Sequence, residues 1–260
     1  MHSSARITDW EDRILNCGAG DGQSLSHVRC FAAVGSTMDC AREALPNLGP
    51  RDRALFLARE QLQGRGRQGR VWAQPKVGFY GTYAFAAPQG IASIAGFSLV
   101  VGIAVARLVQ SFGSQVRLKW PNDIYTDEGA KFSGILVDIV TLKDVPWILT
   151  GIGINLSGEP QVDTKVSSLE TLTGRRLDVP SVAAQLSPIL LKLWEEYAGF
   201  GFAAFKSEWL GLAYALGKQI TIDTGSDRLS GIFNGVSDRG GIVLERGSEL
   251  VEIISGHVIA

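Results

Sequence analysis

Residues 91–109 (IASIAGFSLVVGIAVARLV) form a long apolar stretch that limits what the chain can fold into. The stretch nearly reaches transmembrane length, but serines, two internal glycines and Arg107 interrupt it, and polar strand-like sequence continues on both sides. We therefore expect a core helix that is buried on all sides, which needs other layers of protein to cover it. A chain of 260 residues, 45% hydrophobic and 20% charged, is typical of a soluble globular protein with such a core.

Short β-branched runs predict the layers around this helix. Residues 133–140 and 147–154 are separated by a turn around 143–146, so we expect these two strands to pair. Ser36 is a suitable N-cap for a helix over 37–45, which Pro46 would stop. The remaining expectations are irregular or weakly helical structure over 1–30, strands at 53–59, 79–86 and 116–120, and helices at 181–197 and 201–212.

The pattern changes near Leu216, where short strands punctuated by the turns GSD, DRGG and RGSE replace the longer elements. Short, evenly spaced strands of this kind indicate a small antiparallel barrel. We place a boundary between Tyr214 and Gly217, which gives domains 1–214 and 215–260. The expected strands are 219–223, 229–236, 241–245 and 249–255.

Charge and cysteine content argue against several classes of function. The formal net charge is −1, so no global field would hold a polyanion. Cys17, Cys30 and Cys40 form no C-x-x-C pair and lack histidines at the spacing of a metal site, so we do not expect a zinc site. Reduced thiols in a cytoplasmic protein are the expected state, and the polar, acidic N-terminus has no apolar signal core.

Residues 63–72 (QGRGRQGRVW), called the arginine loop below, carry three arginines spaced by glycines and then Trp72. Glycine lets the backbone approach a phosphate closely, and arginine supplies a charged fork that matches phosphate oxygens. An aromatic side chain offers a flat face to an adenine ring. The composition therefore predicts a local binding device for a small anion.

The sequence of this loop allows two other interpretations. Gly64, Gly66 and Gly69 match the G-x-G-x-x-G dinucleotide fingerprint, but Pro75 and Gly78 prevent the helix that must follow it. A solvated basic loop without a ligand is the other alternative. A Walker A loop is excluded because no G-x-x-x-x-G-K-[ST] string occurs in the chain.

Polar and cationic residues recur where the predicted strands end, which is where a sheet can build a site. Asn122 and Asp123 follow Pro121, Lys131 precedes the strand GILVDIV, and Asn155 ends the string GIGIN. Each has an ordinary explanation as well. Asn–Asp after proline is common turn chemistry, a lysine at a strand mouth is usually solvated, and the glycines can relieve packing.

Taken in order, these strings resemble the biotin protein ligase family. The resemblance spans nearly the whole chain from about residue 30 and runs through Gly35-Ser36-Thr37, Glu60-Gln61, GRGRQGRVW, KWPNDIY, KFSGILVDI, GIGIN and the closing VEIISGHV. It implies an α+β fold, with a catalytic domain related to class II aminoacyl-tRNA synthetases, a mixed sheet flanked by helices, and a C-terminal SH3-like β-barrel. Only about 30 residues precede it, so we expect a short form without an N-terminal helix-turn-helix domain.

The activity implied by the resemblance is ATP-dependent biotinylation through biotinyl-5′-adenylate. The acyl group then passes to a lysine of a biotin carboxyl carrier domain. By resemblance, the catalytic residues are Lys131, Arg67 and Asp123, with Asp123 also near a Mg²⁺ ion. The biotin-binding residues would be Ser36, Thr37, Gln61, Gly64, Arg65 and Gly134, and the nucleotide-binding residues Arg65, Arg67, Arg70, Trp72, Asn122, Lys131 and Asn155.

Three residues depart from the family pattern, and three rival functions stay open. Met38 stands where asparagine is usual, Asp138 where glutamate is common, and His257 in place of an acidic residue. The rivals are a lipoate or octanoate ligase, a DNA-binding regulator and a non-catalytic sensor of biotin or its adenylate. We expect a cytoplasmic monomer or homodimer that binds neither DNA nor membranes.

Overall fold

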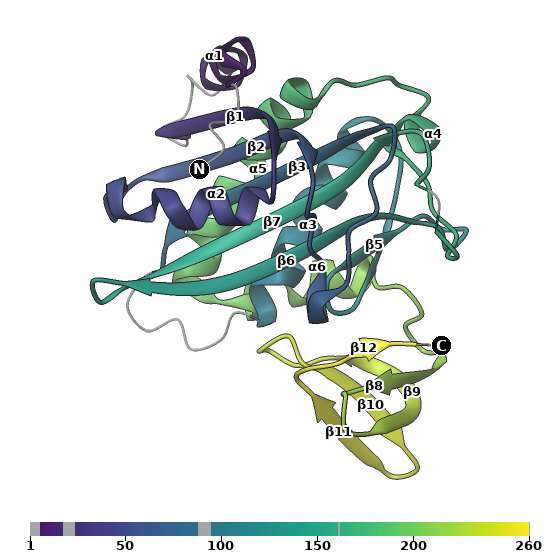
Figure 1. Cartoon of the computed structure of the whole chain (residues 1–260). Helices are drawn as coiled ribbons and strands as arrows, with labels where there is room; N and C mark the ends of the chain where they lie inside the picture. Colours follow the sequence, from purple (N-terminus) through teal and green to yellow (C-terminus); the bar gives the residue numbers. More distant parts are fainter. Residues whose placement is uncertain (1–5, 18–23, 88–94, 161, 260) are drawn as a thin grey trace.

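A seven-stranded mixed sheet, in the order β1-β2-β3-β7-β6-β5-β4, dominates the computed structural model (Figure 1). The structure describes residues 6–17, 24–87, 95–160 and 162–259. β1 and β2 are parallel and all other neighbours are antiparallel. The strands are β1 (His27–Val34), β2 (Arg53–Gln61), β3 (Val77–Ala86), β4 (Arg117–Lys119), β5 (Asp123–Tyr125), β6 (Lys131–Leu142) and β7 (Val145–Ser157).

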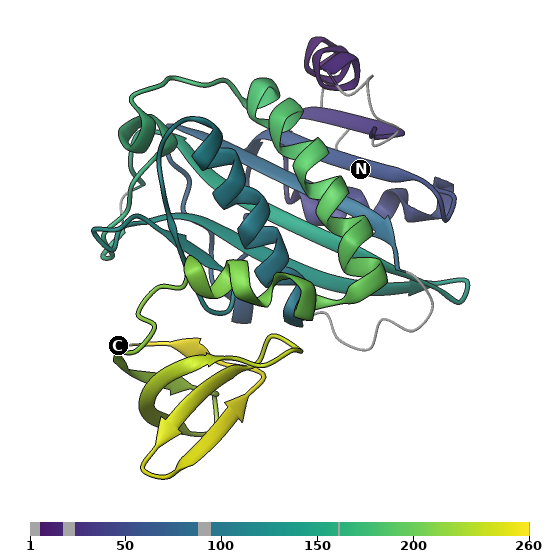
Figure 2. The same ribbon diagram turned by 180° about the vertical axis from the view of Figure 1, so that it is seen from behind.

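Helices cover both faces of this sheet. α3 (Ala95–Ser111) and α5 (Val179–Phe200) lie side by side on one face, and α2 (Thr37–Ala44) lies on the other (Figures 1 and 2). α3 is the expected core helix, and its first expected residues, 91–94, lie outside the described part. Its residues Val100, Ile103 and Ala104 have no exposed surface, as its all-apolar sequence predicts. In the described part of the chain, no helix is long and apolar enough to cross a membrane.

The N-cap of α2 forms as the sequence predicts. The backbone N–H of Met38 donates to Oγ of Ser36, at 3.3 Å, and Ser36 has an extended backbone. The apolar side of α2 packs on the sheet in a small cluster of its own. Its buried members are Met38, Ala41, Leu45, Ala54, Phe56, Ala84, Trp147 and Leu149. This packing places the N-terminus of α2 over the middle of β3 and β7, near Thr82 and Gly151.

The predicted hairpin of residues 133–140 and 147–154 forms as β6 and β7, which pair from Ser133 opposite Ile154 to Leu142 opposite Val145. Lys143 and Asp144 make the turn with φ values of 48° and 62°. Two consecutive residues of positive φ match the right-handed twist of the strands. The hairpin therefore sets the register that brings Gly134 opposite Gly153.

Two expectations differ from the structure. The helix expected at 201–212 is split into a 3-10 turn, Phe202–Phe205, and α6 (Lys206–Gly211). The aromatic side chains of this segment are buried in the core. The region 1–30, expected to be irregular or weakly helical, contains α1 (Thr8–Cys17) and the start of the strand β1. A contact between residues distant in sequence holds α1 in place: the Glu11 carboxylate accepts a hydrogen bond from the backbone N–H of Cys30, at 2.8 Å.

A second, five-stranded antiparallel sheet follows α6, in the order β11-β10-β9-β8-β12 (Figure 1). Its strands are β8 (Gln219–Asp223), β9 (Arg228–Val236), β10 (Ile242–Arg246), β11 (Glu249–Ile253) and β12 (His257–Val258). This arrangement confirms the expected mixed sheet flanked by helices, followed by a separate antiparallel β unit. The sequence did not predict β12, which returns to pair with β8. The domain boundary after residue 214 stays our proposal.

Candidate active site

A pocket of about 510 Å³ lies between the arginine loop, the N-terminus of α2, the β4–β5 turn, the central strands β6 and β7, and β12. Its volume lies within the range of small-molecule sites. The pocket brings together all the predicted catalytic and binding residues except Gly64 and Asn155. Those lining it are Ser36, Thr37, Gln61, Arg65, Arg67, Arg70, Trp72, Asn122, Asp123, Lys131 and Gly134.

The arginine loop folds over this pocket as a short closed turn. The N–H of Gly66 donates to the carbonyl of Arg70, at 2.7 Å, and Arg70 donates back to Arg67, at 3.2 Å. Gln68 and Gly69 take positive φ values of 57° and 72°. A non-glycine residue is uncommon in this region, so the turn is held by its ends rather than by local preference.

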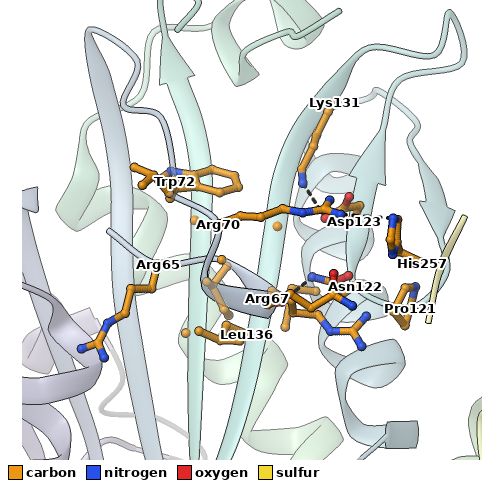
Figure 3. Close-up of a pocket in the computed structure, with 18 of the residues that line it drawn as sticks. Arg65, Arg67, Arg70, Trp72, Pro121, Asn122, Asp123, Lys131, Leu136 and His257 are labelled. Carbon is orange, nitrogen blue, oxygen red and sulfur yellow. Dashed lines mark hydrogen bonds and ion pairs between the residues drawn. The ribbon is translucent and has the colours of Figure 1, made fainter. Parts of the chain in front are cut away.

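Cationic side chains gather around one carboxylate in the pocket, and Figure 3 shows Lys131 paired with Asp123 and Arg67 and Arg70 in the same space. The Nζ of Lys131 lies 2.6 Å from Oδ1 of Asp123. Arg67, Arg70 and Lys119 line the same space, and Asp123 is the one acidic residue of the lining among the described residues. This excess of positive charge, held in place by the fold, favours an anionic ligand.

Burial and neighbouring charges shift the pKa values of two of these cations, Arg67 and Lys119. Desolvation lowers the pKa of Arg67, and the Asp123 carboxylate offsets part of that shift. Desolvation also lowers the pKa of Lys119; Asp123 raises it in part, and Lys131 lowers it further. An arriving anion would relieve the repulsion among these groups, as fixed cations at a phosphate site do.

Arg65 does not join this cluster. Its guanidinium forms an ion pair with Asp39 of α2, and Figure 3 shows it directed away from Lys131 and Asp123. Arg65 contributes to the wall of the pocket on the α2 side. Its predicted contact with a carboxylate or phosphate stays a prediction, while the structure gives it an anchoring contact.

Buried hydroxyl and amide groups line the α2 side. Oε1 of Gln61 accepts hydrogen bonds from the backbone N–H of Thr37, at 2.8 Å, and from its hydroxyl, at 3.0 Å. The Thr37 hydroxyl also lies 2.8 Å from that of Thr82. Because these partners fix the orientation of the Gln61 side chain, the site offers preorganised polar groups to a small ring.

The indole of Trp72 lies against a floor made of two glycines. A Cβ at Gly134 would lie 2.7 Å from Cζ3 of Trp72, and one at Gly153 would lie 2.8 Å from its Cε2. The Lys131 ammonium sits 5.5 Å from the ring centroid. Nε1 of Trp72 is buried and has no hydrogen-bond partner within the described part of the chain. Only residues without a side chain allow the ring this close to the sheet.

Asn122, Asn155 and Gly64 support the site from its edges. The Asn122 amide donates to the carbonyl of Ile135, at 2.8 Å, which ties the Asp123 turn to β6. The Asn155 amide donates to the carbonyl of Ser167, at 3.0 Å, and its Oδ1 is a buried acceptor without a partner among the described residues. The carbonyl of Gly64 accepts from the N–H of Trp72, at 2.9 Å. Their ligand contacts stay predictions.

Sequence reasoning did not assign several residues that line the pocket. Met38, one of the departures from the family pattern, packs with its Sδ 3.1 Å from the position of a Cβ on Gly151. Lys119 could have been predicted as a site residue, because it is the first residue of the KWPNDIY motif and ends the strand β4. His257 was expected, by resemblance, only to lie in the part of the chain that meets ATP or the carrier protein; the local sequence gives no sign that β12 returns to the arginine loop. Other lining residues without an assigned role include Tyr125, Gly153, Thr164, Val258 and Ile259.

Comparison with known proteins gives the class that fold and pocket define. The model of the Biotin/lipoate A/B protein ligase family matches residues 30–155, and that of the Biotin protein ligase C terminal domain matches residues 215–259. The fold and the cationic pocket therefore belong to this class of ligases.

Individual relatives narrow the class. The Biotin–[acetyl-CoA-carboxylase] ligase of Paracoccus denitrificans is 33% identical over 74% of this chain and 83% of that protein. The Bifunctional ligase/repressor BirA of Escherichia coli is 31% identical, over 78% of this chain and 64% of its own length. The biotin protein ligase of Aquifex aeolicus, solved in complex with biotin and ATP, has a TM-score of 0.79 and 25% identity, over 90% and 98% of the two chains. The chain belongs to the biotin protein ligase family.

Proposed function

We propose that this protein is an ATP-dependent biotin protein ligase. It activates biotin as biotinyl-5′-AMP and transfers the biotinyl group to a lysine of a biotin carboxyl carrier domain. The observation that carries the proposal is the convergence of Arg67, Arg70, Lys119 and Lys131 on one pocket with a single carboxylate. Family membership and relatives that bind biotin and ATP support it. Because both the nucleotide and the carrier are found in the cytoplasm, the protein acts there.

The first half-reaction joins two anions. A carboxylate oxygen of biotin bonds to the α-phosphorus of ATP while the bond from that phosphorus to the bridging oxygen breaks, and pyrophosphate leaves. Lys131 and Arg67 neutralise the charge that builds up on the α-phosphate, and Arg70 and Lys119 stabilise the leaving pyrophosphate. Because these groups are fixed before the reaction, little reorganisation is needed when the charge develops.

In the second half-reaction, the amine of the carrier lysine attacks the acyl carbon of the adenylate and AMP leaves. The amine must be neutral when it attacks, so it needs a proton acceptor or an anionic partner at the site. Asp123 fills this role because it is the one carboxylate of the described lining, and it lies beside Lys131. Lys131 stabilises the departing AMP phosphate.

The remaining residues divide the pocket between the two substrates. Ser36, Thr37 and Gln61 hydrogen-bond the ureido ring of biotin, and Gly134 lets the bicyclic ring approach the sheet. Trp72 stacks on adenine, and the unpartnered Oδ1 of Asn155 accepts from the adenine amino group. Gly64 allows the loop to close, and Arg65 holds it on the α2 side.

Magnesium enters this proposal with ATP. No cluster of three or more His, Cys, Asp or Glu side chains is present among the described residues, so the chain builds no metal cage of its own there. Mg²⁺ usually binds through one or two carboxylates together with substrate phosphates, and Asp123 could supply one. The ion would offset phosphate charge, while the cations of the chain orient the α-phosphate.

The proposal is tested by incubating the protein with ATP, Mg²⁺ and a biotin carboxyl carrier domain, separately with biotin, lipoate and octanoate. Intact mass spectrometry should find one biotinyl group on the carrier lysine and pyrophosphate in solution. Modification by lipoate or octanoate instead would show the alternative ligase. Absence of pyrophosphate with biotin and ATP, although both bind, would indicate a sensor.

A further inference from the structure

Two hydrogen bonds connect the arginine loop to the C-terminal unit, at Gly256 and His257. Arg67 donates to the backbone carbonyl of Gly256, at 3.0 Å, and Nη2 of Arg70 lies 3.1 Å from Nε2 of His257. Figure 3 shows Arg70 reaching across the pocket to His257. These residues are far apart in sequence, so the fold of the C-terminal unit creates the contact.

Gly256 is required for this arrangement. Its φ is 153°, and a Cβ there would lie 2.8 Å from both the carbonyl oxygen of Asp223 and Cγ2 of Ile222. The missing side chain lets the chain enter β12 against β8, with His257 paired opposite Asp223. The Gly256 carbonyl and the His257 ring are thereby presented together to the loop.

The hydrogen bond fixes the protonation state of His257. A guanidinium only donates, so Nε2 must be the acceptor and the ring proton lies on Nδ1. An imidazolium has no acceptor and could not make this bond. Nδ1 is buried without a partner among the described residues, so no hydrogen bond to Nδ1 favours a different tautomer or ring orientation.

The charges around His257 also favour the neutral ring. Arg70 and Arg67 face it from the arginine loop, Lys119 from β4 and Asp223 from β8. Burial and the three cations lower the pKa of His257, and Asp223 opposes this shift. Protonation would add a positive charge beside Arg70 and remove the acceptor at the same time.

We propose that His257 is a positioning residue: its neutral ring holds Arg70, as the Gly256 carbonyl holds Arg67, so that the arginine loop is closed over the pocket, and protonation of the ring releases it. The kinetic test of this inference rests on the proposed function, because it measures the use of ATP by the ligase. It makes ATP use depend on pH through a residue of the C-terminal unit that touches neither reacting group.

The first test compares His257→Gln, which keeps an acceptor that does not titrate, with His257→Ala, which has none. A matched control is His27→Gln, since His27 pairs with Asp52 at the far edge of the sheet. KM and kcat for ATP are measured from about pH 5.5 to about pH 8, at saturating biotin. We expect the KM of the unmodified protein to rise about tenfold towards acid pH and that of His257→Gln to stay flat. His257→Ala should have the raised KM at every pH, with kcat little changed.

A second readout needs no enzymatic activity. The rate at which trypsin cuts the arginine loop of the ligand-free protein is measured over the same pH range, relative to its rate on a small arginine ester. Cutting should increase at acid pH in the unmodified protein and His27→Gln, and be pH-independent in His257→Gln. Equal pH dependence in His257→Gln and the unmodified protein would overturn the proposal. So would a KM for ATP that falls at acid pH, because His257 would then bind phosphate as a cation. If pyrophosphate is never released but the trypsin pattern holds, the proposed function fails and the role of His257 as a positioning residue stands.

Discussion

Lys131 and Asp123 form an ion pair, 2.6 Å from Nζ to Oδ1, in a pocket whose other charged lining side chains are cations. The two side chains come from neighbouring antiparallel strands, with Asp123 at the start of β5 and Lys131 at the start of β6. Both are partly buried, so water screens the pair only in part. The carboxylate holds the lysine in place before any substrate arrives.

Asp123→Asn removes this charge while keeping the shape of the side chain. We expect kcat for transfer to the carrier to fall at least about tenfold, because Lys131 loses its partner and the incoming amine its proton acceptor. The KM for ATP should not rise, since the pocket becomes more positive. Steady-state biotinylation of the carrier checks this, with Asp127→Asn as the control, because Asp127 pairs with Arg117 outside the pocket. An unchanged kcat would remove Asp123 from the transfer step.

Gly153→Ala tests the floor beneath Trp72. The new methyl group would lie 2.8 Å from the indole, so the ring must shift away from the sheet. Stacking of a base on an aromatic side chain is worth about 1–3 kcal/mol, and we therefore expect the KM for ATP to rise about tenfold. Gly199→Ala is a suitable control, because no atom lies within 4 Å of its added carbon. If both variants keep the KM of the parent, Trp72 does not position adenine.

Asp39→Asn tests the anchor of the arginine loop on α2. Without the carboxylate, Arg65 loses its ion pair, and we expect trypsin to cut the ligand-free loop severalfold faster. Biotin with ATP should restore protection, because the loop then closes on an anion. Asp238→Asn, which breaks an exposed pair with Lys206, should leave the rate unchanged. Equal rates in the two variants would show that Asp39 does not hold the loop.

Thiol chemistry gives a pH prediction that is independent of the active site. Burial raises the pKa of Cys30 to about 12 and that of Cys40 to about 11. The thiolate is the reactive form, so at about pH 8 both should alkylate far more slowly than a free cysteine. Peptide mapping after brief iodoacetamide treatment, with and without urea, measures each site. Rapid labelling of Cys30 in the folded protein would contradict its burial.

The sequence predicted the elements that depend on local pattern. Ser36 and Pro46 mark the two ends of α2, and alternating β-branched residues mark the β6–β7 hairpin, because capping and pleating act over a few residues. Most of the site residues that the resemblance named do line the pocket. The partners of Arg65 and Arg70 could not be predicted. Asp39 and His257 meet the loop only after the sheet, α2 and β12 have packed, and no local pattern encodes such contacts.

The most direct test of the account is the single-turnover rate of pyrophosphate release from biotin and ATP in Arg67→Ala and Lys131→Ala. If fixed cations stabilise the charge that develops on the α-phosphate, each variant should slow this step by about 10²–10³-fold. Arg42→Ala, which removes an arginine that pairs with Asp138, should keep the parent rate. A rate within about twofold of the parent in both pocket variants would contradict the account.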